Sequence, residues 1–113
     1  MADRTLKEPA RELPVAADKD VVVAGGGLTG VMAAVAAARS GASALLVEQY
    51  GSLGGVATMH LPLQGYYDSA GTQIVRGLAQ ELLDRLRAVG GAGDFIRCEL
   101  HNPYIIVDQE AVK

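Results

Sequence analysis

Three glycines within six residues have the spacing of a turn that could bind a pyrophosphate. The segment is Gly25-Gly26-Gly27-Leu28-Thr29-Gly30, which fits the pattern G-x-G-x-x-G. In such a pattern the first glycine permits a tight turn, the second lets the backbone approach the phosphates, and the third lets a helix pack closely on a strand. Because the chain contains 14 glycines, the pattern carries weight only if the flanking residues form the right elements.

The flanking residues do predict those elements. Residues 20–24 form a short apolar run rich in β-branched residues, which is typical of a buried parallel strand. We expect a helix from Leu28 to about Ser40, closed by Gly41, and a second strand over residues 42–47. The backbone N–H groups of Leu28 and Thr29 would then face the phosphates at the positive end of the helix dipole.

Glu48 stands at the end of the second expected strand, about 20 positions after the glycines. A carboxylate at this position can accept hydrogen bonds from the hydroxyls of an adenosine ribose, whereas it would repel a 2′-phosphate. The sequence therefore predicts a dinucleotide site and argues against a cofactor of the NADP type. The alternative is an ordinary glycine-rich turn followed by a solvated glutamate, which requires several features to coincide by chance.

A second glycine-containing loop follows Glu48. Residues 49–55 contain Gly51, Gly54 and Gly55, too many glycines for a continuing helix. The stretch from Val47 to Thr58 resembles the "E…LGG…T" stretch of FAD-dependent oxidoreductases. The resemblance implies that FAD is the cofactor and that this loop passes the pyrophosphate and approaches the flavin. The residues it adds to the site are Gln49, Gly54, Gly55, Ala57 and Thr58.

The resemblance continues toward the end of the chain. Residues 77–86 are similar to the "GxxxELLxRL" helix of the FAD-dependent oxidoreductases related to the fumarate reductase and heterodisulfide reductase flavoproteins. Residues 107–113 are similar to the "DPEALK" start of a further helix in that family, with Gln109 where the family usually has proline. We expect Asp108 to cap this helix and Gln109 to occupy its first position.

The resemblance covers only the beginning of the family's much longer chains. It leaves out the third parallel strand, a second flavin-binding motif and the substrate domain, and a helix over residues 108–113 would be barely one turn long. We therefore expect an incomplete α/β fold with a Rossmann-like βαβ unit. It would comprise a polar lead-in over residues 1–19 and a partial FAD-binding domain over residues 20–113. We expect this domain to be completed either by polypeptide that the chain lacks or by a partner chain.

Composition excludes several other classes. The formal net charge is −3, with 10 basic and 13 acidic residues and no basic cluster, so the chain lacks the electrostatic signature of a nucleic-acid-binding protein. No apolar segment is long enough to span a bilayer, and residues 1–17 contain no apolar core of a secretory signal. The single cysteine, Cys98, fits a reducing compartment. We therefore expect a cytoplasmic protein.

The remaining segments carry weaker signals. Residues 58–72 have no sustained period and predict a loop or lid. In it, His60 is a minor candidate for a proton donor or, as in some relatives, a covalent attachment point for the flavin. Tyr66, Tyr67 and Asp68 are minor candidates for lining a substrate cavity. Apolar residues recur at helical spacing from Ile74 to Val89, which predicts an amphipathic helix ending at Gly90-Gly91. Residues 95–100 and 104–107 predict either a hairpin or two separate strands.

Three hypotheses follow from these patterns. The first is the FAD-binding portion of a flavin-dependent oxidoreductase that acts on a small-molecule substrate, with electron transfer carried by the flavin. The second is a non-catalytic nucleotide-binding or assembly module that keeps the βαβ unit alone. The third is a truncated fragment without activity of its own.

Overall fold

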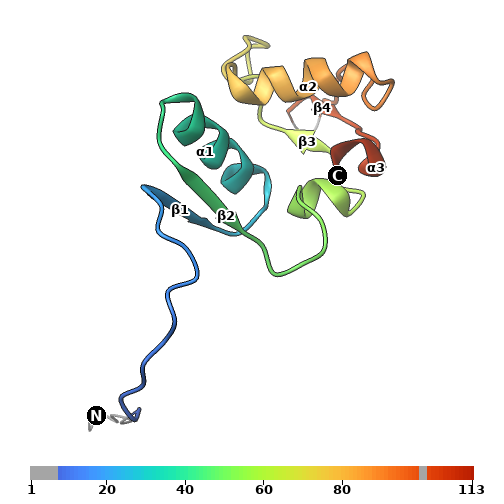
Figure 1. Ribbon diagram of the computed structural model, residues 1–113. Helices are drawn as coiled ribbons and strands as arrows, with labels where there is room; N and C mark the ends of the chain where they lie inside the picture. The colour runs from blue at the N-terminus through green and yellow to red at the C-terminus, as the bar shows by residue number, and fades with distance from the viewer. Residues whose placement is uncertain (1–7, 100–101) are drawn as a thin grey trace, which may run out of the picture.

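The structure, a computed structural model, describes residues 8–99 and 102–113. Its helices and strands fall into two units, with short helical segments between them (Figure 1). The first unit contains β1 (Val21–Ala24), α1 (Leu28–Arg39) and β2 (Ala44–Val47). The second contains β3 (Leu63–Gln64), α2 (Leu78–Ala88) and β4 (Tyr104–Ile105), and the turns between the units are η1 (Gly55–Thr58) and α3 (Gln109–Val112).

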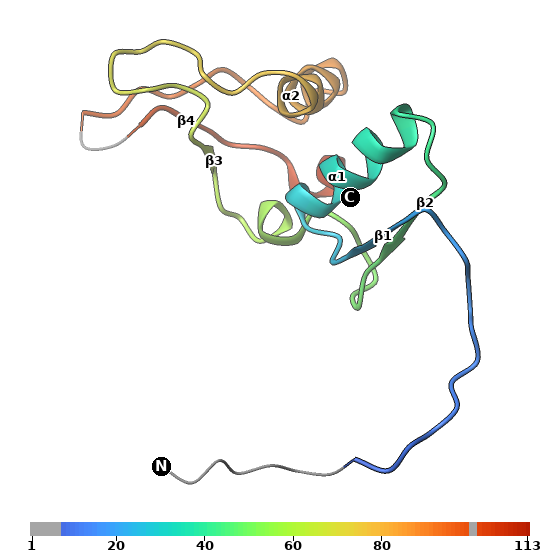
Figure 2. The same ribbon diagram turned by 90° about the vertical axis from the view of Figure 1, so that its left-hand side faces the viewer.

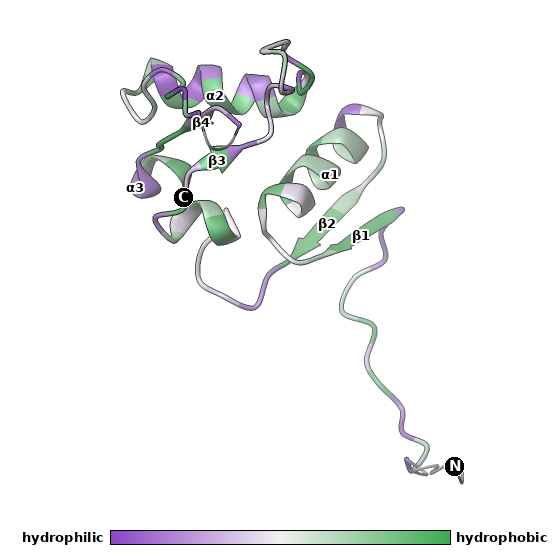
Figure 3. Cartoon of the chain, turned by 180° about the vertical axis from the view of Figure 1, so that it is seen from behind, coloured by the Kyte–Doolittle hydropathy of each residue, from purple (hydrophilic) through white to green (hydrophobic). Residues whose placement is uncertain are grey.

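The first unit is the expected βαβ arrangement. Strands β1 and β2 pair in parallel, with Val21 opposite Ala44 and Ala24 opposite Val47. Helix α1 connects them and contacts both strands. Most of its residues are alanines and other small side chains, which permit a short distance between helix and sheet, and Figure 3 shows its predominantly apolar character. The predicted α/β class with a partial Rossmann-like unit is thus confirmed.

Helix α1 covers only one face of this two-stranded sheet (Figure 2). On the strands, Val22 and Val47 remain 59% and 51% exposed. Parallel strands are normally covered on both faces, because their connecting helices lie on both sides of the sheet. The described part of the chain therefore leaves apolar sheet surface uncovered.

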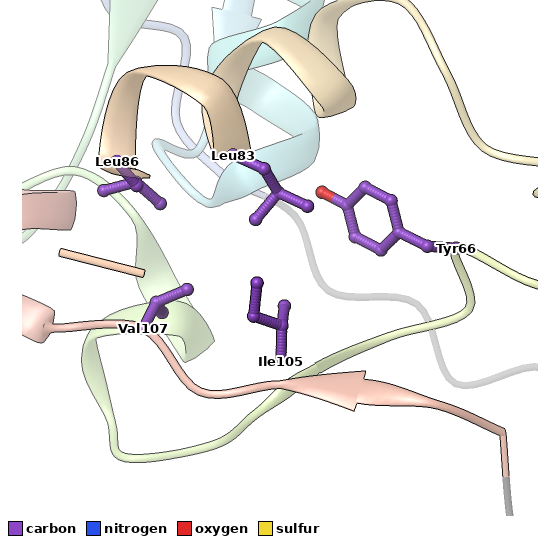
Figure 4. Packing of buried hydrophobic residues seen from close by; sticks show 5 residues of the cluster. All are labelled: Tyr66, Leu83, Leu86, Ile105 and Val107. Carbon is purple, nitrogen blue, oxygen red and sulfur yellow. The ribbon is translucent and has the colours of Figure 1, made fainter. Parts of the chain in front are cut away.

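The second unit contains the main hydrophobic core. Strands β3 and β4 pair antiparallel, with Leu63 opposite Ile105, and α2 packs over them. Leu83 and Ile105 are fully buried at the centre of this core. Figure 4 shows the five buried side chains that form it, which are Tyr66, Leu83, Leu86, Ile105 and Val107.

Helix α2 begins later than the apolar spacing predicts. Gly77 precedes it with a φ of +64° and a ψ of −132°, a non-helical conformation that glycine adopts readily and that prevents the helix from extending back to Ile74. The N–H groups of Ile74 and Val75 instead donate to the carbonyl of Tyr66, at 2.9 and 3.2 Å. The prediction that Ile74 and Val75 belong to the helix was therefore wrong. The helix ends at Ala88, just before the predicted Gly90-Gly91.

The predicted loop over residues 58–72 contains the end of η1 and the short strand β3. Its outer turn is held by Asp68, whose carboxylate accepts hydrogen bonds from the N–H groups of Ala70 and Thr72. Farther along the chain, Ile96 and Tyr104 exchange two backbone hydrogen bonds, which is hairpin-like pairing. Residue 100 of the predicted strand lies outside the described residues.

The ends of the described chain differ in character. Residues 8–19 are extended and exposed, as Figure 2 shows. Helix α3 begins as predicted, because the Asp108 side chain accepts hydrogen bonds from the N–H groups of Glu110 and Ala111 and thereby caps the helix. Across residues 8–99 and 102–113, none of the helices has the length and apolar character that crossing a membrane would require.

Candidate cofactor site

The first turn of α1 presents backbone donors that are not used within the helix. Gly27 is the N-cap, and the first helical hydrogen bond runs from the Val31 N–H to the Gly27 carbonyl at 2.9 Å. The N–H groups of Leu28, Thr29 and Gly30 precede that bond and so have no carbonyl acceptor in the helix. Together with the positive end of the helix dipole, they form a site suited to an anion.

The geometry of the turn requires glycine at two positions for different reasons. Gly25 has a φ of +104°, and its N–H donates to the Val47 carbonyl at 2.7 Å. A β-carbon at Gly30 would lie 1.9 Å from the Gly25 carbonyl oxygen, so only glycine allows the helix to approach the turn this closely. A β-carbon at Gly27 would meet no atom within 4 Å, which leaves open space beside the unused N–H groups.

Glu48 lies against this turn and not free in solvent. One carboxylate oxygen, Oε2, accepts a hydrogen bond from the Gly26 N–H, and the other, Oε1, accepts one from the Tyr50 N–H at 2.9 Å. These bonds, first from Tyr50 and then from Gly26, hold the pKa of Glu48 below its usual value. The side chain is therefore ionised at neutral pH. Each oxygen keeps a lone pair that could accept a ribose hydroxyl.

The structure brings the second glycine loop onto the first. The Gly54 N–H donates to the Gly26 carbonyl at 2.8 Å, and Gly27 and Gly54 form an isolated parallel bridge. A β-carbon at Gly55 would lie 3.0 Å from Cα of Gly27. Gly54 and Gly55 both have positive φ angles, of +104° and +54°. The two loops therefore form one continuous backbone surface beside the N-terminus of α1.

The residues after this contact begin η1. Ala57 is buried, whereas the Thr58 hydroxyl donates to the Gly55 carbonyl at 2.7 Å and so stabilises its own turn. Gln49 is exposed, and its backbone makes a minor contribution to the lowered pKa of Glu48. The structure thus gathers ten of the twelve predicted site residues around the turn of α1, with Ala57 and Thr58 one helical turn farther along.

The minor candidates lie elsewhere. His60 is exposed and has a φ of +60°. The Tyr66 hydroxyl donates to the Ala79 carbonyl at 3.0 Å within the core. Tyr67 and Asp68 line a separate surface cavity of about 690 Å³ together with side chains that include Arg87, Phe95 and Cys98. Within the part of the chain that the structure describes, no three histidine, cysteine or carboxylate side chains are grouped as a metal site would require.

Two contributors to this region were missed from the sequence. Tyr50 donates through its backbone N–H to Glu48, a contact between residues two positions apart that a local side-chain-to-backbone rule could have suggested. Val112 packs against Gly54 from α3, as the distance of 2.8 Å between its Cγ1 and a β-carbon built at Gly54 indicates. Because Val112 and Gly54 are far apart in the sequence, no local sequence pattern predicts this contact.

The chain was compared with models of known protein families, with curated proteins and with solved structures. A family model described as FAD dependent oxidoreductase matches residues 20–113, which include the glycine turn, Glu48, the second glycine loop and α3. Neither a curated protein nor a solved structure matches the chain.

Proposed function

Because the chain belongs to the FAD-dependent oxidoreductase family, we propose that residues 20–113 bind the adenosine and pyrophosphate half of FAD and position its flavin half. FAD is the cofactor of the family. When bound, its isoalloxazine supplies the electron transfer. The protein residues bind the cofactor, orient it and limit the access of water.

The contact between Glu48 and the glycine turn is the observation that carries this proposal. It places a carboxylate beside the N-terminus of α1, where the unused N–H groups of Leu28, Thr29 and Gly30 lie. In this arrangement the N–H groups hold the pyrophosphate and Glu48 accepts the ribose hydroxyls. The open space at Gly27 fits the cofactor, since a phosphate could approach the backbone there without meeting a side chain.

The second glycine loop continues the site toward the flavin. The Gly54 N–H is hydrogen-bonded to the Gly26 carbonyl, so the second glycine loop starts beside the pyrophosphate turn. From there η1 leads away from the turn. Because the Thr58 hydroxyl donates to Gly55, its hydrogen atom is already used within the turn. We therefore assign backbone groups of residues 54–58, and not the Thr58 hydroxyl proton, to the flavin side of the site.

Additional polypeptide completes the site in this proposal. The sheet formed by β1 and β2 has two strands, and Val22 and Val47 expose apolar surface on it. A flavin needs walls on several sides to be shielded from water, and these residues supply only part of them. The small-molecule substrate and its site belong to the same completing polypeptide. A cytoplasmic location also remains a prediction.

The proposal is tested by titrating the purified full-length chain with FAD, alone and with an adjacently encoded polypeptide. FAD binding is followed by flavin fluorescence and visible absorbance, and NADPH serves as a competitor. Glu48→Ala removes the carboxylate, so FAD affinity should fall by about 1.5–3 kcal/mol, the value of a hydrogen bond to a charged group. NADPH should compete poorly, because Glu48 repels its 2′-phosphate.

Glu12→Ala is the matched control, because Glu12 lies in the exposed lead-in. It should leave FAD affinity unchanged. If the chain binds ADP-ribose or NAD but never FAD under either condition, it is a nucleotide-binding module and not a flavin site. An unchanged FAD affinity in Glu48→Ala would remove Glu48 from the site.

A further inference from the structure

Helix α3 contacts the glycine loop although it lies more than fifty positions later in the chain. A β-carbon built at Gly54 would lie 2.8 Å from Cγ1 of Val112 and 2.7 Å from Cγ2 of Thr58. Gly54 is buried, and α3 packs along η1, as Figure 1 shows for the two short helical turns. Val112 therefore occupies the space immediately outside the second glycine loop.

On its other side α3 is fixed to the core of the second unit. The Asp108 N–H donates to the Gly91 carbonyl at 2.7 Å, just after the end of α2. The Asp108 carboxylate then caps α3, and a β-carbon at Gly91 would lie 2.5 Å from Cβ of Ala111. The helix is thus held between the Gly91 turn and the Gly54 loop.

Beyond Gly54 the contacts continue to the cofactor site. Gly54 donates to the Gly26 carbonyl at 2.8 Å, and the Gly26 N–H donates to the Glu48 carboxylate. A contiguous series of contacts therefore runs from the end of α2, through α3 and the two glycine loops, to Glu48. Each step is a hydrogen bond, a helix cap or close packing, so a shift at one point displaces its neighbours.

We propose that Val112 is a positioning residue for the cofactor. It holds the Gly54 loop against Gly26 and Gly27, so that the second unit controls how well the pyrophosphate turn is formed. Val112 does not contact the cofactor and acts through Gly54. This inference rests on the proposed function, because the turn that it positions is the one assigned to FAD.

The test compares Val112→Ala with Val112→Ile in the full-length chain. Val112→Ala removes both γ-methyl groups, including the Cγ1 that packs against Gly54, whereas Val112→Ile keeps both γ-carbons and serves as the rescuing variant. We expect the dissociation constant for FAD to rise between about 2-fold and 30-fold in Val112→Ala, the range of indirect coupling between contacting residues. Val112→Ile should bind FAD as the unaltered chain does. Val89→Ala is the matched control, because Val89 is 72% exposed at the end of α2.

A second readout needs no cofactor. Hydrogen exchange of the Gly54 amide reports whether its bond to the Gly26 carbonyl opens. In Val112→Ala this amide should exchange faster, while amides in the middle of α1 should be unaffected. Faster exchange confined to Gly54 and its neighbours separates a local role of Val112 from general loss of stability.

The outcomes distinguish the positioning role of Val112 from the proposed binding of FAD. If the unaltered chain binds FAD and Val112→Ala binds it equally well with unchanged Gly54 exchange, the positioning role is wrong and the proposed function stands. An equal loss of affinity in Val89→Ala and Val112→Ala also overturns it. If the unaltered chain binds no FAD, with or without the adjacently encoded polypeptide, the proposed function fails first and the positioning role fails with it.

Discussion

The two glycines at either end of the first helical turn have opposite tolerances for a side chain. A β-carbon at Gly30 would lie 1.9 Å from the Gly25 carbonyl oxygen, while one at Gly27 would meet nothing within 4 Å. Gly27 also has a φ of −64°, which alanine adopts without strain. Substitution by alanine therefore distinguishes Gly30, which the fold requires, from Gly27, which leaves space for a ligand.

We expect Gly30→Ala to destabilise the βαβ unit by about 1–3 kcal/mol or more, because the added methyl group would clash with the backbone carbonyl of Gly25 and not with a flexible side chain. Urea unfolding followed by circular dichroism measures this loss. Gly93→Ala is the control, because a β-carbon there also meets no atom within 4 Å. Equal stability of the Gly30→Ala and Gly93→Ala variants would show that the turn is looser than the structure indicates.

Gln109 is a residue whose substitution we expect to raise the stability of the chain. Its Nε2 atom is buried without a hydrogen-bond partner among the described residues, a costly state for an amide. Asp108 before it has extended dihedral angles, φ −72° and ψ 126°, which suit a following proline, and proline is favoured at the first helical position.

Gln109→Pro should therefore stabilise the chain by about 1 kcal/mol or more, through loss of the buried amide and reduced freedom of the unfolded chain. Thermal unfolding measures the change. Gln109→Ala removes the amide without restricting the backbone, so the difference between the two variants isolates the contribution of proline. A lower melting temperature in both variants would mean that the Gln109 amide has a partner in solution.

At the scale of elements, an ion-pair cluster joins α1 to α2. The Glu81 carboxylate accepts hydrogen bonds from Nη1 and Nη2 of Arg39, at 2.7 and 2.8 Å, and from Nε of Arg85 at 2.9 Å. The Arg39 bonds are the main cause of the lowered pKa of Glu81, which is about 2, and Arg85 adds to it. The cluster thus links the last turn of α1 to the first turn of α2.

The pH dependence of this link has a defined sign. Because the pKa of Glu81 in the folded chain lies below its ordinary value of 4.5, its stabilisation is complete above about pH 4.5 and is lost as the pH falls toward 2. Glu81→Gln should be less stable than the unaltered chain near neutral pH. The two stabilities should converge on acidification, as urea unfolding across this range would measure. A constant difference at all pH values would show that Glu81 does not titrate through this cluster.

How well each element could be predicted depends on how local its causes are. The βαβ unit is encoded by continuous apolar runs and a glycine turn, so both strands and the helix appear within a few residues of their predicted bounds. The start of α2 was misplaced because Ile74 continues the apolar spacing of the helix, whereas Gly77 interrupts its backbone. Strands β3 and β4 are far apart in the chain, and only two residues of each strand pair. Strands this short produce no periodic pattern in the sequence that could predict their pairing.

The same distinction applies to the cofactor site. Glu48 and both glycine loops could be named from the sequence, because their spacing reflects the shape of a dinucleotide. The bonds from Gly26 and Tyr50 to Glu48, and the packing of Val112 on Gly54, depend on tertiary structure. Composition and spacing indicate which residues belong together, but not which of them hold the others in place.

At the scale of the whole molecule, the two units differ in how much of their apolar surface is buried. The second unit encloses Leu83 and Ile105 completely, whereas α1 has no fully buried residue and β1 and β2 expose Val22 and Val47. We therefore expect the βαβ unit, which contains most of the proposed cofactor site, to be the less stable part. Cofactor binding should stabilise this unit in particular.

Addition of the adjacently encoded polypeptide should protect the amides of β1 and β2 from hydrogen exchange, if it covers the open sheet. Protection should be weaker in α2, whose core is already complete. Hydrogen exchange of the chain, alone and with that polypeptide, measures both. Protection confined to α2 would place the partner on the wrong unit and contradict the proposed completion of the flavin site.

The most direct test of the central claim, that the first turn of α1 binds the pyrophosphate of FAD, is the FAD affinity of Gly27→Ala. The added methyl group has room in the free chain, so the folded structure should persist, as circular dichroism can verify. FAD should bind at least about tenfold more weakly, because the methyl group occupies the approach to the unused N–H groups. Gly93→Ala should bind FAD normally. A Gly27→Ala chain that binds FAD as tightly as the unaltered one would contradict the account.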